Sequence, residues 1–361
     1  MLTEVQLERS VDWLITNASA PVRYLTHIRI LGTSPASGEA ASLWQEVEED
    51  PSSLEVFGKQ RTDGSWCDGG AWAPKPSYIP KSGHTPVSPK YVTTCWMLII
   101  LGDMGYTVKD PRVARACEWV MGWQRSNGVL SESRKPYTDD DYDPSPRNVP
   151  CRMSIQMDGL SRVGFGSDPR MVKAWGLMLG WQREDGGWLN EGHRDATASP
   201  YKVWDRSCPW VTYFATSALY HSGIEEYDEN LKRALSFILW HLDHKDPYDI
   251  QRFFWHGHDT VRELVMFAKY GFSPEQRSIK TLLSWLGTMY DDGLGVFRYV
   301  GKPISKMRWR EDGATPTVMK YRLFHLIEPD WLTYWATRAM YGFLEPIESS
   351  VDSNKRYEKA L

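Results

Sequence analysis

The chain lacks the long apolar runs and the export leader that would direct it into or across a membrane. Its longest uninterrupted apolar run covers residues 95–101, whereas a membrane-spanning helix needs about 18–20 such residues. The N-terminal segment carries Glu4 and Glu8 and is amphipathic, whereas a signal peptide has a basic start and a uniformly apolar core. We therefore expect a cytoplasmic protein with no integral membrane segment.

Features of nucleic-acid-binding, redox and disulfide-stabilised proteins are also missing. The 42 basic and 46 acidic side chains give a net charge of −4, and no basic block marks a nucleic-acid surface. No glycine-rich nucleotide motif indicates a redox cofactor. The five cysteines include no Cys-x-x-Cys pair, and a chain of this size needs no disulfides, so we expect reduced thiols.

Tryptophan, by contrast, is abundant. The chain has 18 tryptophans among 361 residues, with 42% hydrophobic and 24% charged side chains overall. This composition is typical of a folded globular chain. The indole rings supply large flat apolar surfaces, which either fill a core or line a pocket.

Internal repeats organise the sequence. Residues 110–128 align without gaps with residues 168–186, and both begin with Asp-Pro-Arg and end with Gly-Trp-Gln-Arg-x-x-Gly. A shorter copy occupies residues 58–66, and weaker copies occupy residues 231–241 and 279–293. The pattern predicts about five helix-pair repeats.

Glycine closes the second helix of each pair. Helical segments that begin near residues 92, 152, 209, 259 and 330 end at Gly105, Gly164, Gly223, Gly271 and Gly342. Glycine is favoured just past a helix end, and no period-two alternation persists. Residues 5–16, 22–31 and 38–49 read as further helices. We predict an all-α fold of roughly thirteen helices.

The loops between helices are unequal in length. Few residues follow each glycine, but long loops rich in proline and aromatic residues cover residues 66–91, 130–150, 188–208 and 296–329. If the helix pairs alternate around a ring, all the long loops fall at one end. Long ordered loops on one face of a rigid scaffold usually carry function, so we expect the site there.

A glutamine–glycine–tryptophan motif carries a resemblance to a known family. It occurs as Gln60-x-x-x-Gly64-x-Trp66, as Gln182-x-x-x-Gly186-x-Trp188 and, in part, as Gln124-x-x-x-Gly128. The motif matches the QW repeat of terpenoid cyclases, and the chain resembles the prenyltransferase and squalene-oxidase repeat family. The resemblance implies an α/α toroid of inner and outer helices, one domain over residues 1–361 with an N-terminal helical extension (1–53), repeats (54–344) and a tail (345–361).

In such a motif each residue type has a structural role. Glutamine at the end of an outer helix can hydrogen-bond exposed backbone groups, glycine turns the chain, and tryptophan packs back across the repeat boundary. Trp66 and Trp188 are therefore expected to be packing residues.

Two signatures of terpenoid cyclization are absent or misplaced. The Asp-x-Asp-Asp acid of squalene-type cyclases does not occur, so protonation-initiated cyclization of that kind is not expected. Residues 139–143, Asp-Asp-Asp-Tyr-Asp, fit the pattern that holds magnesium over a diphosphate. They lie in a proline-rich loop, so a solvated acidic loop is the alternative.

The resemblance also implies a zinc site. Protein prenyltransferase β subunits bind zinc through Asp-x-Cys at the start of one inner helix and His at the start of the next. The matching residues are Asp205, Cys208 and His258, which are suitable zinc ligands and would leave a fourth position open. One extra residue separates Asp205 from Cys208, and a metal-free cluster is the alternative.

Alignment of the inner helices on their terminal glycines places several reactive groups at one rim. Cys151, Trp210 and His258 take equivalent positions, and Cys208 takes that of His256. A helix N-terminus lowers the pKa of a cysteine and favours bound anions. Cys151 and Cys208 are candidate nucleophiles or acid–base groups, with small buried thiols as the alternative.

The densest chemical string is His-Gly-His-Asp at residues 256–259. The imidazoles of His256 and His258 titrate near neutrality and can exchange protons. Asp259 either joins them or caps the following helix. Asp205 and Cys208 are the expected acid–base partners.

The residues expected to bind substrate are mostly aromatic. Arg152 is expected to hold a carboxylate or diphosphate at the same rim. An aromatic wall, able to stabilise cationic intermediates or to stack on sugar rings, is expected from Trp210, Tyr213, Trp255, Trp331, Tyr334 and Trp335.

These observations favour an enzyme, a terpenoid cyclase-like lyase or isomerase with an aromatic cavity. It would act on a small apolar, isoprenoid-like substrate by acid–base chemistry: cyclization, isomerization or elimination. The alternatives are a zinc-dependent prenyltransferase, a non-catalytic lipid-binding scaffold, and a carbohydrate lyase or glycoside hydrolase with paired carboxylates from Asp195, Asp205 and Asp259. The sequence carries no signature for the substrate's identity or for the oligomeric state.

Overall fold

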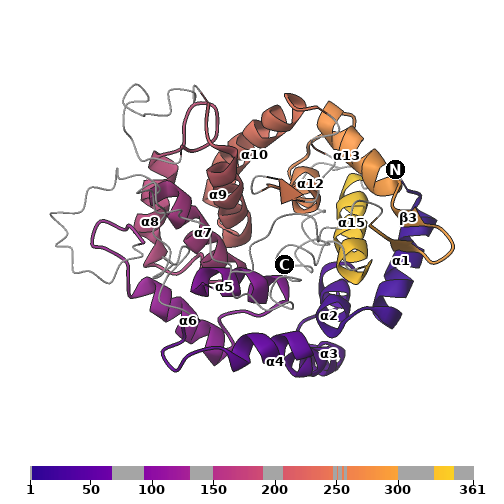
Figure 1. Ribbon diagram of the computed structural model, residues 1–361, viewed down its shortest axis with the longest axis horizontal. Helices are drawn as coiled ribbons and strands as arrows, with labels where there is room; N and C mark the ends of the chain where they lie inside the picture. Colours follow the sequence, from indigo (N-terminus) through magenta and orange to yellow (C-terminus); the bar gives the residue numbers. More distant parts are fainter. Residues whose placement is uncertain are drawn as a thin grey trace, which may run out of the picture. The chain divides into compact units, whose positions relative to one another are not determined.

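The part of the chain that the computed structural model describes is mainly helical (Figure 1). The structure describes residues 2–66, 93–130, 149–189, 206–246, 250, 254–255, 258–299 and 329–344. These residues form thirteen α-helices, one 3-10 helix and four two-residue strands, which confirms the predicted all-α class. In this part of the chain, no helix is long and apolar enough to cross a membrane.

In the described residues the helices follow one another, with short strands near residues 254–259 and 290–297. The helices are α1 (Glu4–Asn17), α2 (Ala20–Arg29), α3 (Gly38–Glu49), α4 (Pro51–Gly58), α5 (Thr94–Asp103), α6 (Pro111–Met121), α7 (Val149–Arg162), α8 (Met171–Gly180), α9 (Pro209–Ser222), η2 (Glu225–Tyr227), α10 (Asp228–Asp243), α12 (Thr260–Lys269), α13 (Arg277–Gly287) and α15 (Pro329–Leu344). The strands are β1 (Phe254–Trp255), β2 (His258–Asp259), β3 (Tyr290–Asp291) and β4 (Val296–Phe297), paired as two antiparallel hairpins.

Two compact units make up the chain. Unit 1 comprises Met1–Glu55, Leu239–Glu311 and Thr315–Leu361, and unit 2 comprises Val56–Ile238 and Asp312–Ala314. Helices from both ends of the sequence therefore belong to one unit. The single toroid domain over residues 1–361 remains a prediction.

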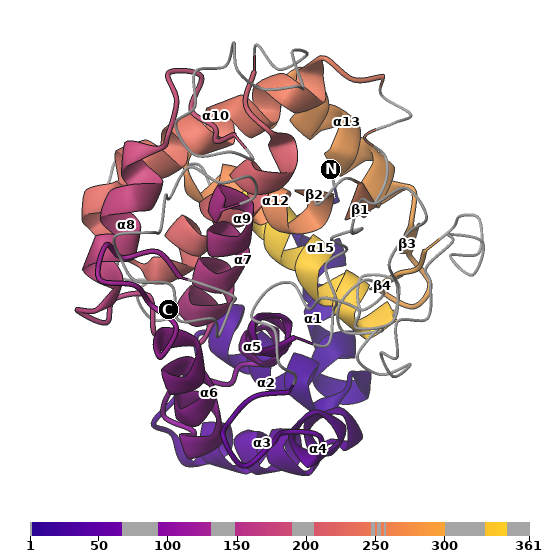
Figure 2. The same ribbon diagram turned by 60° about the vertical axis from the view of Figure 1, so that its left-hand side comes forward.

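Unit 2 is built from two layers of helices. Helices α5, α7 and α9 lie side by side with α7 in the middle, and α6 and α8 form the second layer (Figures 1 and 2). We call α5, α7 and α9 the inner helices, as in the predicted repeat. Gly105, Gly164 and Gly223 follow them with φ of 96°, 82° and 65°, which confirms that these glycines lie just past helix ends.

The repeated Asp-Pro-Arg sequence lies at the start of two outer helices of unit 2, α6 and α8. Asp110 caps α6 by accepting the backbone N–H of Arg112 at 2.8 Å, and Pro111 fills the first helical position. In the second copy, Asp168 accepts the backbone N–H of Arg170 at 2.9 Å, and α8 begins one residue later. The same three residues therefore fix the start of two outer helices.

The glutamine of each motif joins its own loop to the next outer helix. Its Nε2 donates to a carbonyl oxygen at the start of that helix: Gln60 to Arg112 at 2.9 Å, Gln124 to Arg170 at 2.9 Å, and Gln182 to Asn230 at 2.8 Å. In the two full motifs the same atom also donates to the carbonyl oxygen of the motif's glycine. The predicted role of glutamine is confirmed, and we call this arrangement a QW junction.

The glycine of each QW junction lies directly on the next outer helix. The φ angles of Gly64, Gly128 and Gly186 are 90°, 95° and 89°, in the left-handed region that favours glycine. An added Cβ atom would press on Arg115, Lys173 and Arg233, respectively. A side chain at these positions would therefore separate the loop from the helix.

The tryptophans of the two full motifs pack as predicted. Trp188 Nε1 donates to the carbonyl oxygen of Met178 at 2.6 Å, and Trp66 Nε1 donates to that of Val56 at 2.7 Å. Each indole therefore folds back onto the outer helix that precedes its motif. Trp188 is only 1% exposed.

A fourth junction of the same geometry occurs in unit 1 without a glutamine. Tyr290 OH donates to the carbonyl oxygen of Gln6 at 2.9 Å, and Gly295, with φ of 71°, packs on Arg9. In each QW junction the residue bonded by glutamine precedes the residue under the glycine by three positions. Gln6 and Arg9 keep this spacing. Helix α1 is therefore docked on the loop after α13 in the way that an outer helix is docked on its QW motif.

Helix α15 packs against α12, α1 and α2 within unit 1 (Figure 2). Gly271 follows α12 with φ of 77°, as predicted. The prediction that Gly342 ends a helix is wrong, because Gly342 lies inside α15. An added Cβ atom there would lie 2.8 Å from Ala268 Cβ, so this glycine allows α15 to approach α12 closely.

Replacing Gly186 with alanine should lower the free energy of unfolding by at least about 2 kcal/mol, because φ is left-handed and the new Cβ would meet the Arg233 carbonyl oxygen. Gly176→Ala is the matched control. Gly176 lies within α8 with open space around the added Cβ, so alanine should raise stability by up to about 1 kcal/mol. Urea unfolding followed by circular dichroism measures both, and equal effects would contradict the junction geometry.

Replacing Tyr290 with phenylalanine should lower the free energy of unfolding by about 1 kcal/mol, the usual net value of one hydrogen bond, because the bond to Gln6 is lost. The ring contact with Phe297, at 5.3 Å between centroids, stays in place. Tyr227→Phe is the control, since the Tyr227 ring packs on Trp175 and its hydroxyl has no hydrogen-bond partner among the described residues. An unchanged urea-unfolding midpoint for Tyr290→Phe would show that the fourth junction does not stabilise the fold in the way proposed for the three QW junctions.

Candidate functional site

The predicted site residues fall in both units. Unit 2 holds Cys151, Arg152, Cys208, Trp210 and Tyr213, and unit 1 holds Trp255, His258, Asp259, Trp331, Tyr334 and Trp335. Asp195, Asp205, His256 and the acidic loop 139–143 lie outside the described residues. The residues that the structure does describe are taken here unit by unit.

Aromatic side chains of α5 and α9 gather around Phe214 in unit 2. The ring centroids of Trp96, Trp210 and Tyr213 lie 5.4, 5.2 and 5.1 Å from that of Phe214. Tyr213 is buried and Trp210 half-buried. Within the described chain, the indole nitrogen of Trp210 is buried and has no hydrogen-bond partner.

Sequence reasoning found two members of this cluster and missed the other two. Trp96 and Phe214 lie 118 residues apart, twice the 59-residue spacing of Gly105 and Gly164. They therefore occupy the same register position on two inner helices. That spacing was a readable signal, since side chains in register on packed helices tend to meet.

Cys151 and Arg152 lie in the first turn of α7. Cys151 is 4% exposed, and its carbonyl oxygen accepts a hydrogen bond from Ser154 Oγ at 2.9 Å. Arg152 is half-buried. The buried position of Cys151 agrees with the alternative reading of a small core thiol.

Cys208 is the N-cap residue of α9, where a lowered thiol pKa was expected. Burial instead raises the pKa of Cys208, and the backbone N–H groups of Val211 and Trp210 offset only part of this effect. The thiol is therefore protonated at neutral pH. Burial therefore opposes the thiolate expected at this helix N-terminus, and the catalytic role of Cys208 remains a prediction.

Trp255, His258 and Asp259 stand just before α12. Their strands β1 and β2 pair antiparallel, with Trp255 opposite His258 and Phe254 opposite Asp259. Asp259 is the residue immediately before the helix. The backbone therefore places His258 just before the start of α12.

The metal predictions remain predictions. Across the described ranges, no group of three or more His, Cys, Asp or Glu side chains is placed to hold a metal ion. Of the three predicted zinc ligands, only the side chain of Cys208 is described, and the helix N-terminus faces its thiol. The acidic loop proposed for magnesium is outside the described residues.

Three predicted aromatic residues come together on α15 in unit 1. Trp331, Tyr334 and Trp335 are 4%, 1% and 7% exposed. The ring of Tyr334 makes edge contacts with both indoles, at centroid distances of 6.2 Å to Trp331 and 5.1 Å to Trp335. Edge-to-face contacts of this kind hold the three rings in fixed relative orientations.

A buried ion network, absent from the sequence prediction, crosses the inner helices of unit 2. Arg162 of α7 donates to Asp103 of α5 at 2.6 Å, to Asp158 at 2.8 Å and to Ser217 of α9 at 2.7 Å. Ser217 also donates to Asp158 at 2.7 Å. The charged side chains are at most 5% exposed. One guanidinium group therefore hydrogen-bonds two buried carboxyl groups, one on α5 and one on α7.

The network has a sequence signal and an electrostatic consequence. Asp103 and Arg162 are 59 residues apart, and so are Asp158 and Ser217, so the partners sit in register on neighbouring helices. Burial raises the pKa of Asp158 although Arg162 lowers it in part. Among the residues described, Asp158 Oδ2 has no hydrogen-bond partner.

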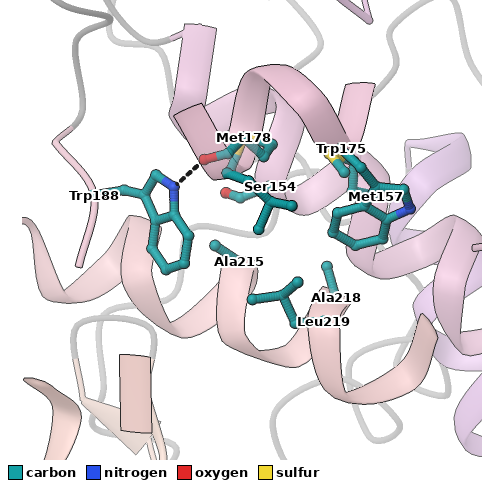
Figure 3. Close-up of a pocket in the computed structure, with 9 residues that line it drawn as sticks. Ser154, Met157, Trp175, Met178, Trp188, Ala215, Ala218 and Leu219 are labelled. Carbon is teal, nitrogen blue, oxygen red and sulfur yellow. Dashed lines mark hydrogen bonds between the residues drawn. The ribbon is translucent and has the colours of Figure 1, made fainter. Parts of the chain in front are cut away.

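An apolar gap in unit 2 lies between α7, α8 and α9 (Figure 3). Its lining includes Met157, Trp175, Met178, Trp188 and Leu219, and it has no room for a water molecule. The indole nitrogens of Trp175 and Trp188 are both bonded to main-chain carbonyl oxygens. These residues fill the core, and the gap is not a ligand site.

Comparison with known proteins gives little guidance. No family model matches the chain, and no curated protein matches it. A solved structure of a protein from Actinoplanes is similar at 14% sequence identity and a TM-score of 0.44, over 94% of this chain and 99% of that chain. The functional argument therefore rests on the residues themselves.

Replacing Asp158 with asparagine should make the protein progressively more stable relative to wild type as pH rises. The raised pKa means that Asp158 stabilises the fold below the ordinary aspartate value of 3.8 and that this contribution is lost as pH rises through the folded-state pKa. Asparagine keeps an oxygen acceptor without the charge. Urea unfolding between about pH 4 and about pH 8 measures the trend.

Asp168→Asn is the control for this trend. Hydrogen bonding from Arg170 holds the pKa of Asp168 below its ordinary value, so its stabilising contribution is present above that value and is lost as pH falls. Between about pH 5 and about pH 8 the difference in stability between this variant and wild type should therefore stay constant, and it should shrink only as pH falls below about 4. Parallel trends in the two variants would contradict the raised pKa of Asp158.

Proposed function

We propose that this chain is an enzyme of the α/α-toroid class that acts on an apolar, isoprenoid-like substrate by acid–base chemistry. The reaction would be a cyclization, an isomerization or an elimination. The observation that carries the proposal is the repeated QW junction, because it is the feature on which the resemblance to terpenoid cyclases rests. Fold alone does not fix function, so the reaction is argued from the inner helices.

The ring itself is part of the proposal. Three QW junctions each dock one outer helix on the previous motif, and the Tyr290 junction docks the first helix of the chain after α13. An arrangement that repeats the same step and uses the N-terminal helix as the partner of a late loop supports a closed α/α toroid.

Aromatic first turns support a cavity for an apolar substrate. Trp96, Trp210 and Trp331 lie within the first three residues of α5, α9 and α15. In a toroid the inner-helix ends face one rim, where these rings would contact an apolar chain and stabilise cationic character developing on it. Tyr213 of unit 2 and Trp255, Tyr334 and Trp335 of unit 1 are assigned to substrate binding in this proposal.

The proton-transfer groups are those at the starts of α9 and α12. His258 and Asp259, with His256, are proposed to exchange protons with the substrate, because an imidazole near its pKa serves as acid and as base. Cys208 is proposed as a proton donor, since burial keeps its thiol protonated. Asp205 is assigned to the same set, and Arg152 to binding a polar end of the substrate.

The test is solvent deuterium incorporation. The purified protein is incubated in D2O with linear isoprenoid alcohols and acids of ten to twenty carbons, and the products are analysed by gas chromatography and mass spectrometry. Acid–base catalysis should place solvent deuterium on carbon, and His258→Ala should lower the rate at least about 100-fold, the usual size of a general acid–base contribution. His244→Ala is the control, because His244 is exposed in the turn just after α10.

Other outcomes identify the alternatives. Stoichiometric zinc in the purified protein and activity lost on chelation would favour a zinc-dependent prenyltransferase. Turnover of an oligosaccharide instead of an isoprenoid would favour a lyase or glycoside hydrolase. Binding without turnover, unchanged in His258→Ala, would leave a non-catalytic lipid-binding scaffold.

A further inference from the structure

Trp210 lies in the first turn of the inner helix α9 and packs on Phe214, with 5.2 Å between the ring centroids. Phe214 also contacts Trp96 of α5 at 5.4 Å, so the three rings join two inner helices. Trp96 and Phe214 are 4% and 3% exposed, whereas Trp210 is half-buried. A ligand that reached this cluster would therefore meet the indole of Trp210 first.

The indole nitrogen of Trp210 lacks an acceptor. Its Nε1 is buried and makes no hydrogen bond in the part of the chain that the structure describes. The indoles of Trp66, Trp175 and Trp188, by contrast, donate to main-chain carbonyl oxygens. An indole N–H can only donate, and a buried donor without an acceptor is unfavourable. A ligand oxygen at this edge of the ring would remove that cost.

The other polar groups at the start of α9 are bonded to one another. Thr212 Oγ1 accepts the backbone N–H of Trp188 at 3.1 Å and donates to the carbonyl oxygen of Cys208 at 2.9 Å. That carbonyl oxygen also accepts the backbone N–H of Thr212 at 3.0 Å. The sulfur of Cys208 accepts the backbone N–H groups of Val211 and Trp210. Within the described residues of this turn, these acceptors already have donors, and the indole N–H of Trp210 is a donor left over.

We propose that Trp210 binds a carbonyl oxygen, so that the substrate of this enzyme is an isoprenoid-like ketone or aldehyde. A carbonyl oxygen accepts the hydrogen bond of Trp210 Nε1 and brings no hydrogen that needs an acceptor, as a hydroxyl group would. A carboxylate fits less well, because its two oxygens need several donors to offset the loss of water. The indole face of Trp210, half-buried beside Phe214, offers apolar surface to the chain of the substrate. This inference rests on the proposed function and names its substrate class.

The test compares oxygen groups on one isoprenoid chain. Isothermal titration calorimetry of the purified protein measures binding of geranylacetone, of the secondary alcohol that its reduction gives, and of geranylacetic acid, which share the same geranyl chain. A straight-chain methyl ketone of similar length is the probe without isoprene units. Geranylacetone should bind about fivefold more tightly than the alcohol, the factor expected for one net hydrogen bond, and more tightly than the acid.

One variant and one spectrum locate the binding of the carbonyl group. Trp210→Phe keeps an aromatic ring and removes the N–H, so it should weaken binding of geranylacetone about fivefold and leave binding of the alcohol unchanged. In infrared spectra, the carbonyl stretch of bound geranylacetone should lie below that of the ketone in an apolar solvent, because a hydrogen bond to the oxygen weakens the double bond. Trp210→Phe should remove this shift.

Trp119→Phe is the matched control. Trp119 lies in the outer helix α6, and its Nε1 is also buried without a partner among the described residues. This variant loses an indole N–H of the same kind, so it should change neither the affinity for geranylacetone nor the carbonyl frequency. Circular dichroism confirms that both variants are folded.

The outcomes separate this inference from the proposed function. Equal binding of ketone and alcohol, or a preference for the ketone that survives Trp210→Phe, would overturn the carbonyl site and leave the isoprenoid enzyme standing. Tighter binding of geranylacetic acid than of geranylacetone would overturn the choice of a neutral oxygen. Binding of the straight-chain ketone that depends on Trp210, with no binding of any isoprenoid, would support the site and overturn the isoprenoid function. No binding of any probe would overturn both.

Discussion

The hydrogen bond from a motif side chain to the first turn of the next outer helix is the interaction on which the rest of the structure depends. It lets the loop backbone rest on that helix, which is why glycine with a left-handed φ follows at Gly64, Gly128 and Gly186. Because each junction repeats the same step, inner-helix residues one repeat apart come into register. The sequence periodicity is therefore a consequence of how outer helices are joined.

The buried ion network shows what this register makes possible. Arg162 meets Asp103 on one side and Ser217 on the other only because α5, α7 and α9 are aligned to within a residue. A buried ion pair is weak evidence for stability, because desolvation offsets much of the attraction. A slip of one helix by one residue would, however, leave a buried charge without its partner. The network therefore acts against misregistered packing of the inner helices.

The sequence was sufficient to predict those structural features that recur in each repeat with the same residue types. The helix pairs, the glycines after α5, α7, α9 and α12, and the glutamine bonds were all predicted from such matches. The fourth junction was not, because Tyr290 replaces glutamine and Gly295 follows at five residues instead of four. The raised pKa of the Cys208 thiol was not predicted, because the helix terminus is visible in the sequence whereas burial is a property of the fold. Gly342 was misassigned because close packing and helix ending both select glycine.

The tryptophans fall into two groups according to whether the indole N–H has a hydrogen-bond acceptor, a distinction that the number of tryptophans alone does not give. Trp66, Trp175 and Trp188 donate to main-chain carbonyl oxygens, as residues built into an architecture should. Trp119 and Trp335 have buried nitrogens without a partner in the described residues, yet only Trp335 also carries two guanidinium groups. An unsatisfied N–H in an outer helix such as α6 is a local packing cost. Trp210, a predicted site residue in the ring cluster around Phe214, has a nitrogen of the same kind, so its indole donor distinguishes it from the tryptophans built into the junctions.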